Sequence, residues 1–227
     1  MTERPWLANY PNGVPGRIDP DQYRSVAAFL EECCDRFRHR PAFTNRGRSM
    51  SYGDLDRLST AFAAFLLDDL QLAKGDRLAI MLPNRLQYPI AIMGALRAGL
   101  TVVNTNPMYT ARELKHQLDD SGAVAILVLD NFAATVAEVI AGTACRHVIC
   151  TGIGDQLGFP KSAITNFVVR HVKKMVPSYS LPQAVRFNTA LERGARLPPR
   201  KVDIGPEDVA FLQYTGGTTG VAKGAML

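Results

Sequence analysis

The sequence predicts an α/β fold with a mainly parallel sheet flanked by helices on both faces. From residue 75 to residue 151, short apolar runs alternate with amphipathic patterns of helical period. Such alternation is typical of parallel strands joined by right-handed helical crossovers. The run 124–129 is continuously apolar, as expected of a strand buried on both faces. The run 209–214 is also apolar and leads directly into a loop rich in glycine.

The chain before residue 75 predicts an arm, a helix and a hairpin. Prolines at positions 5, 11, 15 and 20 predict an extended arm without regular structure. A helix is expected over 25–38, before Pro41. Its apolar residues recur on one predicted face: Val26, Phe29, Leu30, Cys33 and Phe37. The stretches 42–45 and 49–52 flank an Arg-Gly-Arg turn and predict a short hairpin.

A second helix should follow the hairpin. Ser51 can cap its first turn, which also contains Asp54. The stripe expected to face the core is Leu55, Leu58, Phe62, Phe65 and Leu66.

The alternating part of the chain predicts four strands and three helices. Expected strands cover residues 77–82, 100–104, 124–129 and 147–151, and expected helices cover 86–98, 110–121 and 132–140. Gly99 and Gly122 follow two of these helices directly, where glycine is favoured as a C-terminal cap. Thr110 and Glu113 have the spacing of a capping box at the start of one of them. The final strand is expected over 209–214, and residues 224–227 should begin a strand that pairs back on it.

The composition is that of an ordinary globular protein, with 47% hydrophobic and 21% charged residues and a formal net charge of +5. The sequence contains no run of about 18 apolar residues, the length that would indicate a membrane-spanning helix. The N-terminus lacks the basic-then-apolar order of a secretory signal, so we expect a cytoplasmic protein. The four cysteines lack zinc-site spacing and are interpreted as reduced, partly buried thiols. No basic patch is interleaved with aromatic residues, which disfavours nucleic-acid binding.

The candidate functional site is a loop of glycines, hydroxyls and one lysine near the C-terminus. Its residues are Tyr214, Thr215, Gly216, Gly217, Thr218, Thr219, Gly220, Val221, Ala222, Lys223 and Gly224. The glycines let backbone N–H groups approach an anion closely, and successive N–H groups can form an anion-binding nest. The threonine hydroxyls add donors and Lys223 adds a positive charge, so the stretch suits a polyphosphate.

Two other phosphate motifs do not match this stretch. A Walker A loop needs Lys followed by Ser or Thr, whereas Lys223 is followed by Gly224. The G-x-G-x-x-G spacing of a dinucleotide fold is also absent. The alternative without function is a Gly/Thr turn between two strands.

The eleven positions 214–224 resemble the phosphate-binding signature of the adenylate-forming superfamily, which includes acyl-CoA synthetases, luciferases and peptide-synthetase adenylation domains. Ala222 stands where most members have proline, and bacterial long-chain fatty-acid–CoA ligases of the FadD type commonly have alanine there. The stretches 49–55, 94–104 and 104–114 resemble further sequence motifs of the same family. The stretch 104–114 is most similar to the motif of the bacterial long-chain ligases. The resemblance spans the chain and corresponds to roughly the first two-fifths of a family member.

This resemblance implies an ATP-dependent reaction. A fatty-acid carboxylate attacks the α-phosphate of ATP, pyrophosphate leaves, and coenzyme A then displaces AMP from the acyl-adenylate. The family role of the loop is to hold the β- and γ-phosphates together with Mg²⁺. By resemblance, Gly216, Gly217 and Gly220 supply backbone N–H groups, the three threonines supply hydroxyls, Lys223 supplies charge, and Tyr214 anchors the loop to its strand.

We expect residues 1–227 to form an incomplete N-terminal AMP-binding domain, without the small C-terminal domain. The family's adenine-, ribose- and Mg²⁺-binding residues and its catalytic lysine lie in later parts of the sequence, so no catalytic or metal-binding residue is assigned here. The chain alone is therefore expected to be inactive, with its loop the least ordered part. Two alternative functions are left open: a fragment that binds phosphate or a membrane without catalysing a reaction, and a fragment of a medium-chain or aryl-acid ligase. Assembly into a homodimer is also left open.

The segment from Lys161 to Val176 is basic and has helical apolar spacing. Between residues 156 and 191 there is no Asp or Glu. On a helix, the apolar residues of this segment lie on one side and most of the basic residues lie on another. The apolar residues are Ile164, Phe167, Val168, Val172, Met175 and Val176. Such a helix can lie on the anionic inner face of the cytoplasmic membrane. The alternative is a surface helix whose apolar side packs on its own domain.

Overall fold

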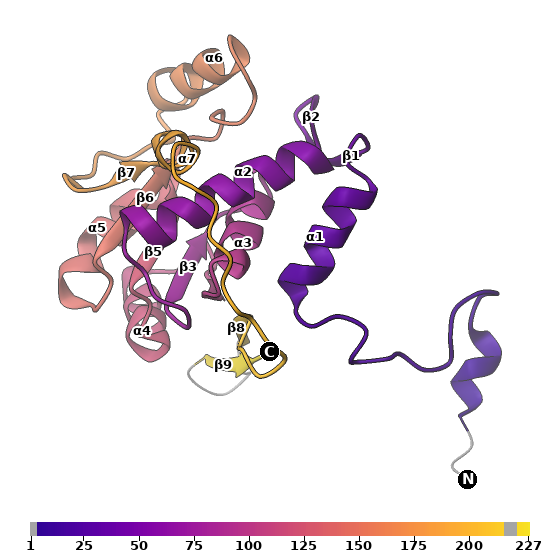
Figure 1. The fold of residues 1–227 in the computed structure, drawn as a ribbon. Helices are drawn as coiled ribbons and strands as arrows, with labels where there is room; N and C mark the ends of the chain where they lie inside the picture. The colour runs from indigo at the N-terminus through magenta and orange to yellow at the C-terminus, as the bar shows by residue number, and fades with distance from the viewer. Residues whose placement is uncertain (1–3, 216–221) are drawn as a thin grey trace.

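The computed structural model describes residues 4–215 and 222–227. The N-terminal arm extends away from the rest of the chain (Figure 1). It contains a short 3₁₀ helix, η1 (Pro5–Asn9), so the expectation of an arm without regular structure is wrong at this point. Pro5 is the first residue of η1, a position where proline's fixed φ angle suits a helix and its missing N–H costs nothing.

The expected helix and hairpin follow the arm. Helix α1 spans Val26–Arg36, and strands β1 (Pro41–Asn45) and β2 (Arg48–Ser51) pair antiparallel. The apolar face predicted for α1 is covered only in part, because Val26 and Phe29 are 44% and 41% exposed whereas Leu30 is half-buried and packs against the core. The fully buried residues of α1 are the smaller Ala27 and Cys34.

Among the described residues, seven strands form one sheet in the order β7-β6-β5-β3-β4-β8-β9. All neighbouring pairs are parallel except β8 with β9, which confirms the mainly parallel sheet. The strand bounds are β3 Arg77–Met81, β4 Thr101–Asn104, β5 Ala125–Leu129, β6 His147–Thr151, β7 Val185–Arg186, β8 Phe211–Thr215 and β9 Lys223–Met226. Every residue of β5 is at most 2% exposed, so this strand is buried on both faces as predicted.

Helices cover both faces of the sheet. One face packs against α2 (Tyr52–Ala64), its π-helical continuation η2 (Phe65–Asp69), α3 (Gln87–Arg97) and α7 (Phe187–Gly194). The other face packs against α4 (Ala111–Ser121) and α5 (Ala133–Val139), which is flanked by the 3₁₀ turns η3 (Asp130–Phe132) and η4 (Ile140–Gly142). Along β3, Leu78 and Ile80 belong to the first core, whereas Ala79 and Met81 belong to the second.

Capping residues in the sequence predicted the ends of several helices correctly. Ser51 with Asp54 and Thr110 with Glu113 form capping boxes with both hydrogen bonds present. Gly122 ends α4 in the left-handed conformation, at φ 61°. The stripe predicted for the second helix is correct, with Phe62 and Phe65 fully buried.

Two elements between residues 177 and 208 were not predicted. Strand β7 has only two residues, and α7 has eight. The signal for α7 was present, because Phe187, Ala190, Leu191 and Gly194 are all buried and recur at helical spacing.

The expected helix in the basic segment is divided into α6 (Lys161–Phe167) and a π-helical part, η5 (Val168–Val172). This segment protrudes from the sheet and its helices (Figure 1). In the described part of the chain, no helix has the length and apolarity that crossing a membrane requires. The four cysteines are free thiols, three of them buried, as predicted.

Candidate functional site

The two stems of the candidate phosphate loop are β8 and β9. They pair antiparallel, with Tyr214 opposite Gly224 and Thr215 opposite Lys223, so the predicted return strand is confirmed. Because the stems are hydrogen-bonded partners, both ends of the loop start from one fixed place on the sheet. The residues between the stems lie outside the described residues, and their assigned roles, like the expected low order of the loop, remain predictions: Gly216, Gly217, Thr218, Thr219, Gly220 and Val221.

Tyr214 ties the first stem to the helix beneath the sheet. Its side chain is 9% exposed and belongs to the core between the sheet and α4. The Tyr214 hydroxyl donates a hydrogen bond to Oδ2 of Asp120, at the end of α4, at 2.5 Å. Burial, and then the hydrogen bond to Asp120, raise the pKa of Tyr214 well above its ordinary value. The phenol therefore keeps its proton and remains a donor.

Helix α4 also contacts the second stem. Nε2 of His116 lies 3.4 Å from the carbonyl oxygen of Ala222, the residue before β9. Gly224 allows the Tyr214 ring to lie against the second stem, because a Cβ at this position would be 3.0 Å from ring atom Cε2. One helix thus holds both stems through side chains near its middle and its end.

Thr215 and Lys223 are exposed where β8 and β9 meet the loop. As directly paired residues on an antiparallel ladder, they stand on the same side of the two-stranded stem. A hydroxyl donor and an ammonium group are therefore presented together, a combination that suits a polyphosphate.

A small cavity of about 200 Å³ lies beside the first stem, at the carboxyl ends of β3, β4 and β8. Three polar side chains are connected along its wall. The Tyr88 hydroxyl donates to Oδ1 of Asn104 at 2.9 Å, and Nδ2 of Asn104 donates to Oε1 of Gln213 at 2.9 Å. Carboxyl ends of parallel strands are where open α/β sheets bind ligands, so this cavity and the first loop stem, whose Gln213 and Tyr214 line it, form one candidate site.

Sequence reasoning did not assign these three residues. Asn104 was placed in a strand and in two stretches that resemble the family, and Gln213 in a strand, but neither was given a role, although both are polar residues near the carboxyl end of an apolar strand. A polar residue at the carboxyl end of an apolar strand was the sequence feature that could have identified them. Their meeting depends on β4 lying next to β8 although more than a hundred residues separate them in sequence.

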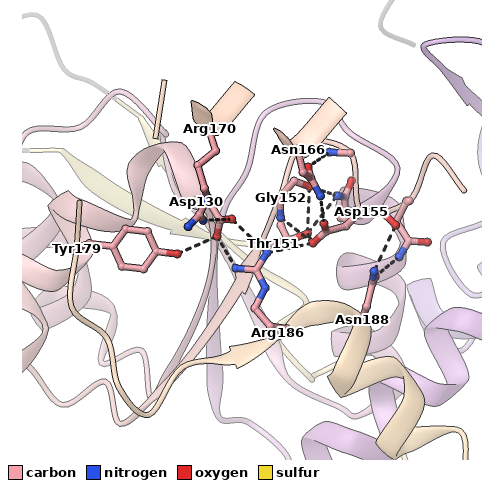
Figure 2. Close-up of polar contacts among 12 residues, drawn as sticks. Asp130, Thr151, Gly152, Asp155, Asn166, Arg170, Tyr179, Arg186 and Asn188 are labelled. Carbon is pink, nitrogen blue, oxygen red and sulfur yellow. Dashed lines mark hydrogen bonds and ion pairs between the residues drawn. The ribbon is translucent and has the colours of Figure 1, made fainter. Parts of the chain in front are cut away.

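A second polar cluster lies farther along the same edge of the sheet, after β5 and β6 (Figure 2). Asp130 is buried and accepts hydrogen bonds from Arg186 at 2.6 and 3.2 Å, from Arg170 at 3.2 Å and from the Tyr179 hydroxyl at 3.1 Å. Arg186 also contacts Asp155 at 3.3 Å, so its guanidinium bridges two carboxylates. Burial lowers the pKa of Arg186, but hydrogen bonding and the charge of Asp130 outweigh it and raise that pKa overall. This cluster was not predicted either.

Most of the apolar side of the basic segment is not covered by the described residues. Ile164, Phe167, Val172 and Met175 are 59%, 60%, 65% and 51% exposed. Val168 and Val176 are half-buried. The surface-helix alternative required these side chains to be covered, and four of the six are not covered by described residues.

The comparisons with known proteins agree with this geometry. A family profile described as AMP-binding enzyme matches residues 30–227. The long-chain-fatty-acid–CoA ligase of Salmonella typhimurium is 53% identical over 222 residues, and that of Yersinia pestis is 54% identical over 225 residues. These matches cover 98% and 99% of this chain but 40% of each relative. The chain therefore spans about 40% of the length of the curated relatives it matches.

Solved structures with the same fold are more distant in sequence. A long-chain-fatty-acid–CoA ligase from Archaeoglobus fulgidus has a TM-score of 0.70 at 24% identity, with 96% of this chain and 39% of that chain covered. An anthranilate CoA ligase in complex with anthranoyl-AMP has a TM-score of 0.73 at 15% identity, with 92% and 36% covered. These likenesses support the fold alone. The profile match across most of the chain, on an α/β sheet that ends in the expected loop stems, shows that the chain belongs to the AMP-binding enzyme family.

Proposed function

We propose that this chain is the phosphate-binding part of a long-chain-fatty-acid–CoA ligase. An oxygen of the fatty-acid carboxylate attacks the α-phosphorus of ATP, the bond to the bridging oxygen breaks, and pyrophosphate leaves. The sulfur of coenzyme A then attacks the acyl carbonyl, its proton is lost, and AMP leaves with the former carboxylate oxygen. The observation that carries the proposal is 53–54% identity to several long-chain ligases over almost the whole chain.

The loop stems support the role proposed for the loop itself. Two anions must meet before the first step, so charge on the departing pyrophosphate has to be balanced. Lys223 is the cation at the second stem, and Thr215 is the hydroxyl opposite it. We assign the phosphate contacts to the backbone and hydroxyls of residues 215–220 and to Lys223. Tyr214 and Ala222 fix the two stems in place, because each contacts a side chain of α4.

Mg²⁺ is the metal expected for this reaction. Within residues 4–215 and 222–227 there is no group of three or more His, Cys, Asp or Glu side chains that could hold a metal ion. The described side chains therefore do not form a coordination site for Mg²⁺, and we assign no metal ligand among them. Mg²⁺ is often bound mainly through substrate phosphates, which is compatible with this arrangement.

A chimeric enzyme tests the proposal directly. Residues 1–227 replace the matching stretch of one of the enterobacterial ligases, and palmitoyl-CoA formation from palmitate, ATP and coenzyme A is measured. The chimera should be active, and Lys223→Gln should lower kcat by about 100-fold, the cost typical of losing one charge-stabilising group. Lys201→Gln, which neutralises an exposed lysine outside the loop motif, should leave the rate unchanged. A well-folded chimera without ligase activity would contradict the proposal, whereas residues 1–227 alone are expected to form no thioester.

We also propose that the basic segment contacts an anionic membrane surface, on the cytoplasmic side. The supporting observation is that four apolar side chains are exposed on a segment without any acidic residue. Fatty acids partition into bilayers, so contact with lipid would bring the enzyme to its substrate.

Sedimentation with vesicles tests this contact. The chain should bind vesicles that contain phosphatidylglycerol, and Lys173→Glu with Lys174→Glu should reduce the bound fraction, because each lysine near the surface contributes about 1 kcal/mol. The matched control is Arg196→Glu with Lys201→Glu, which makes the same charge change at two exposed sites outside the segment. Equal binding by both double variants would remove the proposed site.

A further inference from the structure

The segment between β6 and β7 is attached to the sheet at two separate places (Figure 2). The first holds α6 to the turn after β6. Nδ2 of Asn166 donates to Oδ1 of Asp155 at 2.7 Å, and Oδ1 of Asn166 accepts from the Gly154 amide at 2.8 Å. Oδ2 of Asp155 accepts from the Gly152 amide at 2.7 Å. This attachment consists of short hydrogen bonds around a largely buried carboxylate.

The second attachment holds η5 to the end of β5 and is weaker at one point. Arg170 of η5 makes a single contact with Asp130, at 3.2 Å, and its side chain is 47% exposed against 7% for Asp130. The neighbouring Asn131 also donates to the carbonyl oxygen of Met175 at 2.8 Å. Arg170 is thus a half-exposed cation resting on a buried carboxylate.

Asp130 does not depend on Arg170 for its charge balance. Arg186 gives it two hydrogen bonds, the shorter at 2.6 Å, and the Tyr179 hydroxyl gives a third. If Arg170 leaves, Asp130 remains a paired and hydrogen-bonded carboxylate, so no unpaired charge is buried. The core of the cluster can therefore persist without this one residue.

Arg170 is also close in sequence to exposed apolar residues of the proposed membrane contact. Phe167 precedes it by three positions and Val172 follows it by two, and both are at least 60% exposed. When these side chains enter the acyl boundary of a bilayer, the guanidinium comes to the level of the lipid phosphates. A phosphate accepts two parallel hydrogen bonds from arginine and is a strong competitor for a guanidinium that makes one hydrogen bond to its carboxylate.

We infer that Arg170 is an exchangeable latch: on an anionic bilayer it leaves Asp130 for a lipid phosphate, and η5 opens while α6 stays attached through Asn166 and Asp155. This inference rests on the proposed membrane contact. It deepens that contact by stating which part of the segment moves and which residue controls it.

Hydrogen exchange of backbone amides distinguishes the two attachments. Just after η5, the amides of Lys173 and Met175 donate to the carbonyls of Val168 and Val169 within it. Their exchange should become several-fold faster with phosphatidylglycerol vesicles and stay unchanged with phosphatidylcholine vesicles. The amides of Gly152 and Gly154, held by Asp155 and Asn166, should keep their protection in both cases.

Two variants complete the test. Arg170→Gln should show the faster exchange of Lys173 and Met175 without any vesicles, with little further change when anionic vesicles are added. Lys161→Gln removes a charge from the same segment but from a residue that does not contact Asp130, so without vesicles its Lys173 and Met175 amides should exchange at the wild-type rate.

The outcomes separate this inference from the membrane proposal. If the wild type does not bind anionic vesicles, both ideas are overturned. Binding with unchanged or slower exchange at Lys173 and Met175 overturns the latch alone. Wild-type exchange in lipid-free Arg170→Gln also overturns the latch, because Arg170 would then not restrain η5.

Discussion

Tyr214 joins a strand, a helix and the loop stem opposite it through one side chain. Its ring lies in the core against α4, its hydroxyl bonds Asp120, and Gly224 leaves room for it on the paired strand. At the scale of single residues, the position of the two stems of the candidate phosphate loop therefore depends on side chains of α4 that lie outside the loop motif. Asp120 and His116 are positioning residues in this sense.

Replacing Tyr214 by phenylalanine should lower the free energy of unfolding by about 1–3 kcal/mol, because the Asp120 carboxylate loses its partner. Denaturant unfolding of both proteins measures the difference. Tyr109→Phe is the control, since Tyr109 packs against the same core and its hydroxyl makes no hydrogen bond to a described residue. Equal losses in the two variants would show that the Asp120 bond contributes nothing specific.

The same pair predicts a pH effect at the alkaline end. The pKa of Tyr214 is raised in the folded protein, so the folded state holds this proton more tightly than the unfolded state does. Its contribution to stability is complete below the unfolded value of about 10 and is lost as the pH rises above it. The stability difference between wild type and Tyr214→Phe should therefore shrink above that pH. A constant difference would contradict the assignment.

Helix α7 illustrates close packing at the scale of elements. A Cβ on Gly194 would lie 1.8 Å from the carbonyl oxygen of Ala61, so α7 approaches the backbone of α2 directly. Phe187 at the other end of α7 is fully buried and packs 5.1 Å, centroid to centroid, from the ring of Phe62. These two contacts fix the unpredicted helix against the first core.

Gly194→Ala should therefore destabilise the protein by about 1–3 kcal/mol, the usual cost of forcing extra volume into a packed interface. Thermal or denaturant unfolding measures this change. Gly205→Ala is the matched control, because a Cβ there meets nothing within 4 Å and the backbone is not left-handed. A Gly194→Ala protein as stable as the control would mean that α7 can move away from α2 without cost.

Elements were predictable where local chemistry decides them. The capping boxes of α2 and α4 and the apolar run of β5 depend on neighbouring residues only, and all three were predicted. The partial burial of the apolar face of α1 was not predictable in this way, because Val26 and Phe29 have the right spacing but stay 44% and 41% exposed. Spacing defines a face, and only packing decides which face is buried.

At the scale of the whole molecule, strand order brings distant residues to one edge. Because β4 lies between β3 and β8, Tyr88, Asn104 and Gln213 meet beside the stem of the phosphate loop. The same edge carries Asp130 and Asp155 after β5 and β6, on the other side of β3. The candidate site and the attachment of the basic segment therefore share one edge of the sheet but lie apart along it.

The amino-acid sequence by itself determined the α/β class, most strand and helix bounds, the loop motif and the family resemblance, because these follow from the period and identity of neighbouring residues. Tertiary structure alone decided the strand order, the contacts of α4 with both loop stems, the Asp130 cluster and the exposure of the basic segment's apolar side. Each of these is a contact, or the lack of one, between residues far apart in the chain. No local pattern encodes which distant surface a side chain will meet, and that pairing is settled only when the whole core packs.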